Sequence, residues 1–214
     1  MIDAAPIIRH EVVLGRSEQG RPIIAWETGD PHATRRVLVV GCIHGNEPAG
    51  IAIARALTRV RPPSGVALWI VPDLNPDGVA ADTRQNAHRV DLNRNFPTRW
   101  QAQAGTFASG PQPLSEPESR IAYRLILRVR PAVSIWFHQH EDLVDDSSGN
   151  RALERRFATI AGLPLHPLIP YGGSATTWES ARFPGASSFV VELPSGSLRP
   201  ARVRQFVRAV LAVS

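Results

Sequence analysis

The fold of this chain is decided by the segment Val37-Leu38-Val39-Val40-Gly41-Cys42-Ile43-His44-Gly45-Asn46-Glu47. Its apolar, β-branched first part predicts a strand over residues 37–43, and the glycines around it mark the end of that strand. Apolar residues then recur three or four positions apart over residues 48–60, which predicts a helix. In open sheets built from such strand–helix units, ligands gather at the carboxyl ends of the strands, and His44 and Glu47 stand at such an end.

The same alternation of short β-rich runs with helical patterns extends along the rest of the chain. Strands are predicted over residues 21–28, 37–43, 66–71, 133–137 and 188–193, and helices over 48–60, 116–130, 151–161 and 200–213. Ser115 and Glu118 are expected to form a capping box at the start of the second helix. The segment 73–114 fits neither template, and irregular segments of that length are usually functional. The fold class is therefore α/β, with one mixed β-sheet sandwiched by helices.

The composition is that of an ordinary globular domain. The chain has 214 residues, of which 43% are hydrophobic and 20% charged, so we expect a single domain over residues 1–214. All 24 basic residues are arginine. The lack of lysine excludes Schiff-base, P-loop and protein-kinase chemistry. The single cysteine, Cys42, excludes internal disulfides, cysteine-rich zinc sites and iron–sulfur clusters.

The charge pattern bears on partners and location. The net charge is +5, but the arginines are spread from Arg9 to Arg208 among acidic residues, so we expect no nucleic-acid partner. No apolar run reaches the length of a membrane span, so we expect no membrane partner. The first residues lack the basic and apolar regions of a secretory signal, which favours a cytoplasmic location. The sequence does not predict an oligomeric state.

His44 and Glu47 are the strongest chemical signal. An imidazole and a carboxylate three residues apart can converge on one metal ion, and the pair makes up two thirds of a catalytic zinc set. The alternative is a surface histidine beside a helix-capping glutamate. A third ligand is offered by His138 or His140, which directly follow the apolar run 133–137. Both lie on the same side of an extended chain, so periodicity does not choose between them, and a buried structural histidine is the alternative for each.

Two further groups of residues suggest substrate binding and acid–base chemistry. Arg84, Asn93 and Arg94 lie within eleven positions and could clamp a substrate carboxylate, the alternative being a solvated loop. Glu192 lies inside an apolar strand, where a carboxylate is costly to bury unless it is paired or functional. It is either an active-site base or part of a structural ion pair.

Six motifs occur in an order that resembles the zinc carboxypeptidases of the carboxypeptidase A type. They are Gly15-Arg16-Ser17-Glu18-Gln19-Gly20-Arg21-Pro22-Ile23, His44-Gly45-Asn46-Glu47, Asn75-Pro76-Asp77-Gly78, Asp91-Leu92-Asn93-Arg94-Asn95-Phe96, Ser115-Glu116-Pro117-Glu118 and the late-strand Glu192. The resemblance covers nearly the whole chain. It is closest to the short bacterial members, the murein peptide amidase A group, which also lack a pro-domain.

The resemblance implies a site for one zinc ion. Its ligands would be His44, Glu47 and His138, with His138 preferred because the family's ligand ends the strand. His140, two residues later, would face the substrate. Asp91 would hydrogen-bond His44 and orient it, as carboxylates commonly do behind metal-bound histidines.

The resemblance also implies roles for the remaining polar residues. Glu192 would be the general base, and Arg84 would stabilise the oxyanion. Asn93 and Arg94 would grip the free carboxylate of the terminal residue of the substrate. These roles agree with the chemistry of zinc hydrolysis, in which zinc lowers the pKa of water to near 7 and a carboxylate transfers the proton to the leaving amine.

The chain departs from the larger carboxypeptidases in one respect. These enzymes carry a mobile tyrosine shortly before the catalytic glutamate, whereas this chain has Trp178 but no tyrosine between Tyr171 and Glu192. We therefore expect that role to be unfilled. Arg182 could contact a second substrate carboxylate, such as that of diaminopimelate, the alternative being a solvated surface arginine.

The function predicted is zinc-dependent hydrolysis of an amide bond to a residue with a free carboxylate, specifically the γ-D-glutamyl-diaminopimelate bond of murein peptides. The partner would be a small peptide or N-acyl amino acid. General metallocarboxypeptidase activity and N-acyl amino acid deacylation, of the aspartoacylase and desuccinylase type, are the alternatives. Those deacylases normally add a C-terminal β-domain, for which the roughly twenty residues after Glu192 are too few. A catalytically silent binding protein is disfavoured because all the nominal catalytic groups are present.

Overall fold

The computed structural model describes residues 9–147 and 150–214, and its described part is built on one eight-stranded mixed sheet. The strand order is β1-β2-β4-β3-β5-β8-β6-β7. The strands are β1 (Arg9–Arg16), β2 (Pro22–Gly29), β3 (Arg35–Val40), β4 (Val66–Val71), β5 (Val133–Gln139), β6 (Leu143–Asp145), β7 (Leu165–His166) and β8 (Ser187–Leu193). Neighbouring strands among β4, β3, β5 and β8 are parallel, so their carboxyl ends meet at one edge of the sheet.

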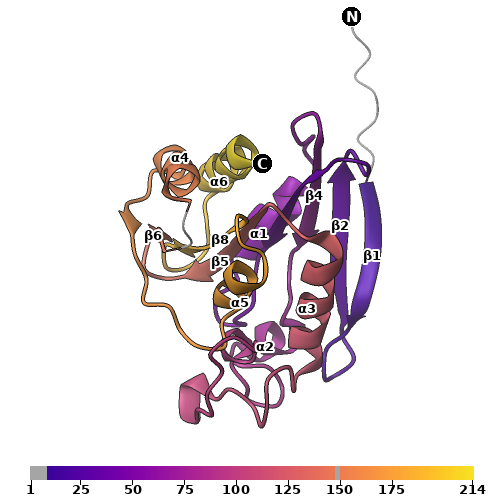
Figure 1. The fold of residues 1–214 in the computed structure, drawn as a ribbon, viewed down its shortest axis with the longest axis vertical. Coiled ribbons are helices and arrows are strands. Elements are labelled where there is room, and N and C mark those ends of the chain that lie inside the picture. The colour runs from indigo at the N-terminus through magenta and orange to yellow at the C-terminus, as the bar shows by residue number, and fades with distance from the viewer. Residues whose placement is uncertain (1–8, 148–149) are drawn as a thin grey trace, which may run out of the picture.

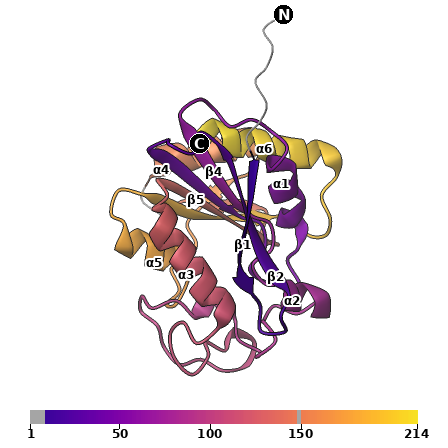
Figure 2. The same cartoon turned by 90° about the vertical axis from the view of Figure 1, so that its right-hand side faces the viewer.

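Helices cover both faces of this sheet (Figures 1 and 2). They are α1 (Ala49–Leu57), α2 (Pro76–Ala81), α3 (Pro117–Val129), α4 (Arg151–Ala161), α5 (Ala175–Arg182) and α6 (Pro200–Val213), with short 3-10 turns at Leu92–Arg94 and Gly105–Phe107. The apolar residues of α1, α4 and α6 pack into one core with one face of the sheet. Those of α3 and α5 pack into a second core on the other face. The fold is therefore the predicted mixed sheet sandwiched by helices.

The central strands follow from their residue types. All six residues of β4, Val-Ala-Leu-Trp-Ile-Val, are buried, and β5 is buried up to its last residue. Parallel strands covered by helices on both faces read as continuous apolar runs, which is why these strands were predicted to within a few residues. The helices α4 and α6 begin and end at the predicted residues. The edge strand β1, the helices α2 and α5 and the short strands β6 and β7 were not predicted.

The predicted capping box is wrong. Pro117 occupies the first turn of α3, so Glu116 rather than Ser115 precedes the helix, and it makes no side-chain cap. The Ser115 hydroxyl donates instead to Glu116 Oε1 at 2.7 Å. Glu118 accepts the backbone N–H of Glu18 at 3.0 Å, a contact between distant segments that the local pattern does not show.

Within the described residues, no helix combines the length and the apolar character needed to cross a membrane. The longest helix, α6, has 14 residues and carries several arginines on its exposed face.

Asp73 follows β4 at the carboxyl edge of the sheet, where burial raises its pKa from 3.8 to about 6. Because the folded state then holds this proton more tightly than the unfolded chain, its contribution to stability is full below about pH 4 and is lost as the pH rises through about 6. We expect Asp73→Asn to raise the free energy of unfolding at about pH 7.5 by about 1 kcal/mol, since asparagine can still accept the backbone N–H of Asn75, which lies 2.9 Å from Asp73 Oδ1.

Urea denaturation at about pH 7.5 and about pH 3.5 measures this effect. The gain should be much smaller at the lower pH, where Asp73 is protonated in the folded state and largely protonated in the unfolded chain. Equal stability of the two proteins at the higher pH would contradict the assignment.

Candidate active site

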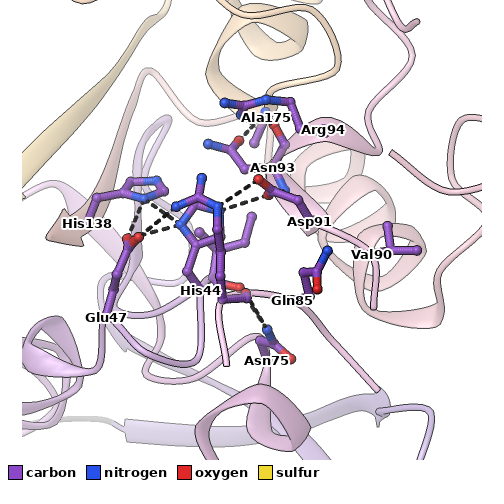
Figure 3. A network of polar contacts seen from close by, with 12 residues as sticks. His44, Glu47, Asn75, Gln85, Val90, Asp91, Asn93, Arg94, His138 and Ala175 are labelled. Atoms are coloured by element: carbon purple, nitrogen blue, oxygen red, sulfur yellow. Dashed lines mark hydrogen bonds and ion pairs between the residues drawn. The ribbon is translucent and has the colours of Figure 1, made fainter. Parts of the chain in front are cut away.

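Three side chains converge at the carboxyl edge of the sheet (Figure 3). His44 Nδ1 and His138 Nδ1 each lie 3.0 Å from Glu47 Oε2, and the two nitrogens are 3.1 Å apart. All three residues are buried, and the three form a group that could hold a metal ion. His44 and Glu47 lie between β3 and α1, whereas His138 comes from β5, so the set brings together segments 91 residues or more apart in sequence.

The local backbone explains how His44 and Glu47 converge. The chain turns directly after β3, and the N–H of Glu47 donates to the His44 carbonyl at 2.9 Å, which brings residues three apart to one side. Gly45 is required in this turn, because a Cβ there would lie 1.9 Å from the carbonyl carbon of Gly78. Both glycines belong to the motifs of the sequence, and their close packing fixes the position of the turn.

Asp91 fixes the tautomer of His44. Its Oδ1 lies 2.9 Å from His44 Nε2, and this carboxylate can accept the ring proton there, which would free Nδ1 to bind a cation. Burial alone would raise the pKa of Asp91, but His44 and Arg84 hold it well below its usual range. The carboxylate is therefore ionised and keeps His44 pointing its free nitrogen at Glu47 and His138.

The donor set fits a divalent cation. His44 Nδ1, His138 Nδ1 and Glu47 Oε2 lie 3.0–3.1 Å from one another, and with the ring protons on Nε2 all three atoms could give a lone pair to one cation. Burial would raise the pKa of Glu47, yet hydrogen bonds and positive charge from the two histidines hold it far below its usual range, so its carboxylate is charged and a bound cation could take the place of those protons. Two imidazoles and one carboxylate are the ligands of catalytic zinc sites that keep a position open.

Glu192 lies beside this group. It stands on β8, paired in register with His138 on β5, and its side chain lines the same cavity as the three metal-binding candidates. Its Oε2 atom is buried and has no hydrogen-bond partner. Burial raises the pKa of Glu192, an effect that His138 opposes and Glu47 reinforces. Within residues 9–147 and 150–214 it forms no ion pair, so the structural ion-pair interpretation is wrong.

Arg84 adjoins the metal-binding group directly. Its NH1 donates to Glu47 Oε1 and its Nε to Asp91 Oδ2, both at 2.9 Å. It lines the cavity and is partly exposed, so it combines a fixed position with access to a ligand. The solvated-loop interpretation does not describe this residue.

Asn93 and Arg94 face the same cavity from the 3-10 turn that follows Asp91. Asn93 Oδ1 accepts the N–H of Ala175 at 3.0 Å, which ties this turn to the start of α5. The Arg94 guanidinium carbon lies 5.3 Å from the ring centre of Phe107 and 4.3 Å from that of Tyr171. Arg94 is only 5% exposed, so it too is not on a solvated loop.

One tyrosine of the described residues, Tyr171, lies at this cavity. Tyr171 is 52% exposed, lines the cavity and covers the Arg94 guanidinium. It is brought there by the two glycines that follow it: the N–H of Gly173 donates to the carbonyl of Thr98 at 2.8 Å and its carbonyl accepts the N–H of Phe96.

The cavity has a volume of about 960 Å³. Besides the residues above it is lined by His140, whose contact with a substrate stays a prediction. Arg182 does not line the cavity. Its guanidinium carbon lies 5.2 Å from the ring centre of Phe183 at the end of α5. The sequence missed the wall formed by α5, which contributes Thr176, Thr177, Ser180 and Ala181. Ser174, which caps α5 by accepting the N–H of Thr177, was the available signal.

Comparisons with known proteins give a match to one family model over part of the chain and a relative that is similar over most of it. A family model described as the succinylglutamate desuccinylase/aspartoacylase catalytic domain matches residues 33–127. Murein peptide amidase A of Escherichia coli K12 is 31% identical over 180 residues, which cover 77% of this chain and 74% of that protein.

Solved structures agree with the similarity to murein peptide amidase A. A murein-tripeptide amidase from Escherichia coli O157 superposes with a TM-score of 0.78 at 25% identity, covering 98% of this chain and 93% of the other. Carboxypeptidase A from Helicoverpa armigera gives the same TM-score at 18% identity, covering 96% and 68%, which shows a shared fold alone.

The fold, the site and the relatives point the same way. The similarity to murein peptide amidase A extends over most of both chains. The site holds three residues that could bind a metal ion, and a solved metallo-carboxypeptidase has the same fold. The chain is therefore a hydrolytic enzyme that belongs to the zinc carboxypeptidase-type family, together with the murein peptide amidases A.

Proposed function

We propose that this enzyme is a zinc-dependent amidase that removes a terminal residue bearing a free carboxylate. Its substrates would be murein peptides, in which it would cleave the γ-D-glutamyl-diaminopimelate bond. The observation that carries the proposal is the pairing of Glu192 with His138 in register, beside His44 and Glu47, in a cavity that also holds Arg94. A general base, a metal-binding set and a carboxylate-binding cation are thereby within one substrate's reach.

One zinc ion would be held by His44, Glu47 and His138. When bound, it would supply Lewis acidity that lowers the pKa of water at its open position to near 7 and polarises the scissile carbonyl. Glu192 would accept the proton of the attacking water on its unpartnered Oε2 and deliver it to the leaving nitrogen. Arg84, a fixed cation beside Glu47, would stabilise negative charge on the carbonyl oxygen.

The terminal carboxylate of the substrate would be held by Asn93 and Arg94. The Arg94 guanidinium carries one hydrogen bond, to the Asn93 carbonyl, so it keeps donors for a bidentate contact. Stacking against Phe107 and Tyr171 would hold its plane in place. His140 lies on the cavity wall and remains a candidate substrate contact. A single catalytic domain over residues 1–214, working in the cytoplasm where recycled wall peptides arrive, completes the proposal.

The decisive experiment is mass spectrometry of the products after incubation of the zinc-loaded enzyme with L-Ala-γ-D-Glu-meso-diaminopimelate. We expect free diaminopimelate from the wild type and none from a chelated sample, with activity restored by added zinc. If zinc is bound stoichiometrically but nothing is released, the amidase assignment is wrong. If no zinc binds, the metal site itself is wrong.

N-acyl amino acid deacylation is a second candidate, because the desuccinylase/aspartoacylase model matches residues 33–127. That match includes His44, Glu47 and Arg94 but ends before His138 and Glu192, so it covers less of the proposed machinery than the amidase relatives do. A panel of N-acetyl and N-succinyl amino acids tests it. Faster release from this panel than from the murein tripeptide would favour deacylation.

Replacing Arg94 should separate binding from chemistry. Arg94→Lys keeps the positive charge but removes the planar fork and much of the stacking between Phe107 and Tyr171, so we expect KM for the tripeptide to rise about tenfold or more while kcat changes little. Arg182→Lys is the matched control, since Arg182 lies off the cavity. Steady-state kinetics measures both variants, and an unchanged KM for Arg94→Lys would contradict its assignment.

A further inference from the structure

Glu179 is a buried carboxylate that the proposed reaction does not use. It lies on α5, is 2% exposed, and points away from the cavity toward the sheet. Its Oε1 accepts the Ser134 hydroxyl at 2.6 Å, and its Oε2 accepts the Ser188 hydroxyl at 2.6 Å and Trp136 Nε1–H at 2.9 Å. In the described part of the chain no cationic side chain pairs with it. A buried carboxylate without a cation is costly, so three dedicated donors require an explanation.

The three donors lie on the strands that carry the proposed catalytic residues. Ser134 and Trp136 belong to β5, which carries His138, and Ser188 belongs to β8, which carries Glu192. Ser134 pairs with Ser188 in the same register in which His138 pairs with Glu192. Side chains alternate along a strand, so residues four positions apart lie on the same face. Through Ser134 and Ser188, Glu179 therefore joins both strands about 13 Å behind the His138–Glu192 pair.

The other side of α5 forms a wall of the cavity. Thr177, Ser180 and Ala181 line it next to Val190 of β8. The first N–H of α5, that of Ala175, donates to Asn93 Oδ1 at 3.0 Å (Figure 3). The helix is thus in contact with the proposed carboxylate clamp at one end and with both catalytic strands along its buried side.

We propose that Glu179 is a positioning residue that fixes α5 against β5 and β8, and thereby sets both the position of Asn93 and the width of the space that receives the terminal residue of the substrate. The proposal rests on the proposed function for its consequence in catalysis. It predicts that loss of Glu179 weakens substrate binding more than it slows the chemical step, because Glu192 and the metal-binding residues stay on their own strands.

Two substitutions separate this role from a merely structural one. Glu179→Ala removes all three hydrogen bonds, and we expect KM for the murein tripeptide to rise about tenfold or more with kcat within about twofold of wild type. Glu179→Gln should restore most of the lost affinity. Its carbonyl can accept from Trp136 and Ser188, and its NH2 can donate to the Ser134 hydroxyl, which can reverse its role.

The matched control is Glu154→Ala. Glu154 is a fully buried glutamate of α4, on the opposite face of the sheet, and lines no part of the cavity. Hydrogen exchange read by mass spectrometry gives a readout that does not need turnover. Glu179→Ala should accelerate exchange in residues 174–183 and leave α4 unchanged, whereas Glu154→Ala should loosen residues 151–161 and leave α5 and KM unchanged.

The outcomes distinguish the two proposals. Unchanged exchange in α5 and unchanged KM in folded Glu179→Ala would overturn the role of Glu179. A wild type that releases no diaminopimelate would overturn the proposed function, while the exchange pattern would still decide whether Glu179 fixes α5. If Glu179→Ala does not fold, Ser134→Ala and Ser188→Ala each remove one of its donors. They should shift exchange and KM in the same direction by less, and no shift in either would count against the proposal.

Discussion

The Glu192→Gln variant is expected to lose about 10³-fold or more in kcat while it keeps its zinc, because glutamine has nearly the shape of glutamate but cannot accept a proton. Within the described cavity, Glu192 is the only base that pairs in register with His138 and stays outside the metal-binding group and its hydrogen-bond network. Its buried Oε2 has no hydrogen-bond partner. Product release followed by mass spectrometry, with zinc content measured on the same samples, checks both halves of this result.

Glu27→Gln on β2 is the matched control, since it makes the same chemical change on a strand whose side chains lie outside the cavity. It should leave kcat and zinc content unchanged. A Glu192→Gln enzyme with more than about a tenth of wild-type kcat would show that the proton is taken by another group.

The same residue predicts the acid limb of the pH profile. Burial raises the pKa of Glu192, with His138 acting against the rise and Glu47 adding to it. A general base works only when ionised, so kcat/KM should fall as the pH drops through a value above the ordinary 4.5 of a glutamate. A limb at or below that value would contradict the expected rise, and it would mean that the positive charge of bound zinc outweighs burial at Glu192.

The sequence predicted the central part of the fold well because burial on both faces leaves little freedom in residue choice. The strand β4 is a continuous apolar run, and β5 and β8 each hold a short apolar run at their centre that no helix of ordinary amphipathic pattern resembles. The strand β1 lies at the edge of the sheet, where it pairs with β2, and it carries Arg9, His10 and Glu11. Its pattern therefore resembles that of a loop. The helix α5 is held by the hydrogen bonds of Glu179 and by the packing of Ala175 and Trp178 into the second core. Neither kind of contact leaves a pattern in the local sequence.

The site was predictable as a set of residue types but not as a set of contacts. The spacing of His44 and Glu47 marks a metal-binding pair, and the turn that joins them is local. The position of Tyr171 over Arg94 depends instead on backbone contacts between residues about 75 positions apart, Phe96 with Gly173 and Thr98 with Gly173. Contacts of that range leave no periodicity in the sequence, so the sequence does not predict that Tyr171 lies over Arg94.

His138→Ala should lose stoichiometric zinc and reduce hydrolysis to the level of a chelated sample, whereas His140→Ala should keep its zinc. The alternation of side chains along a strand leaves these two histidines equivalent, and the structure separates them. His138 is 4% exposed with Nδ1 beside Glu47 Oε2 and His44 Nδ1, while His140 lies exposed on the cavity wall beyond the end of β5. Only His138 can therefore share a cation with the other two.

The measurement is zinc content by mass spectrometry after dialysis, with activity on the murein tripeptide determined in parallel. His140→Ala is the matched control because it removes the same ring from the same cavity two residues away. Its zinc should remain at one equivalent, and any effect should fall on KM, as expected for a side chain that touches substrate. The reverse result, with zinc lost from His140→Ala and retained by His138→Ala, would require the chain after β5 to rearrange when zinc binds, and would refute the His44–Glu47–His138 set.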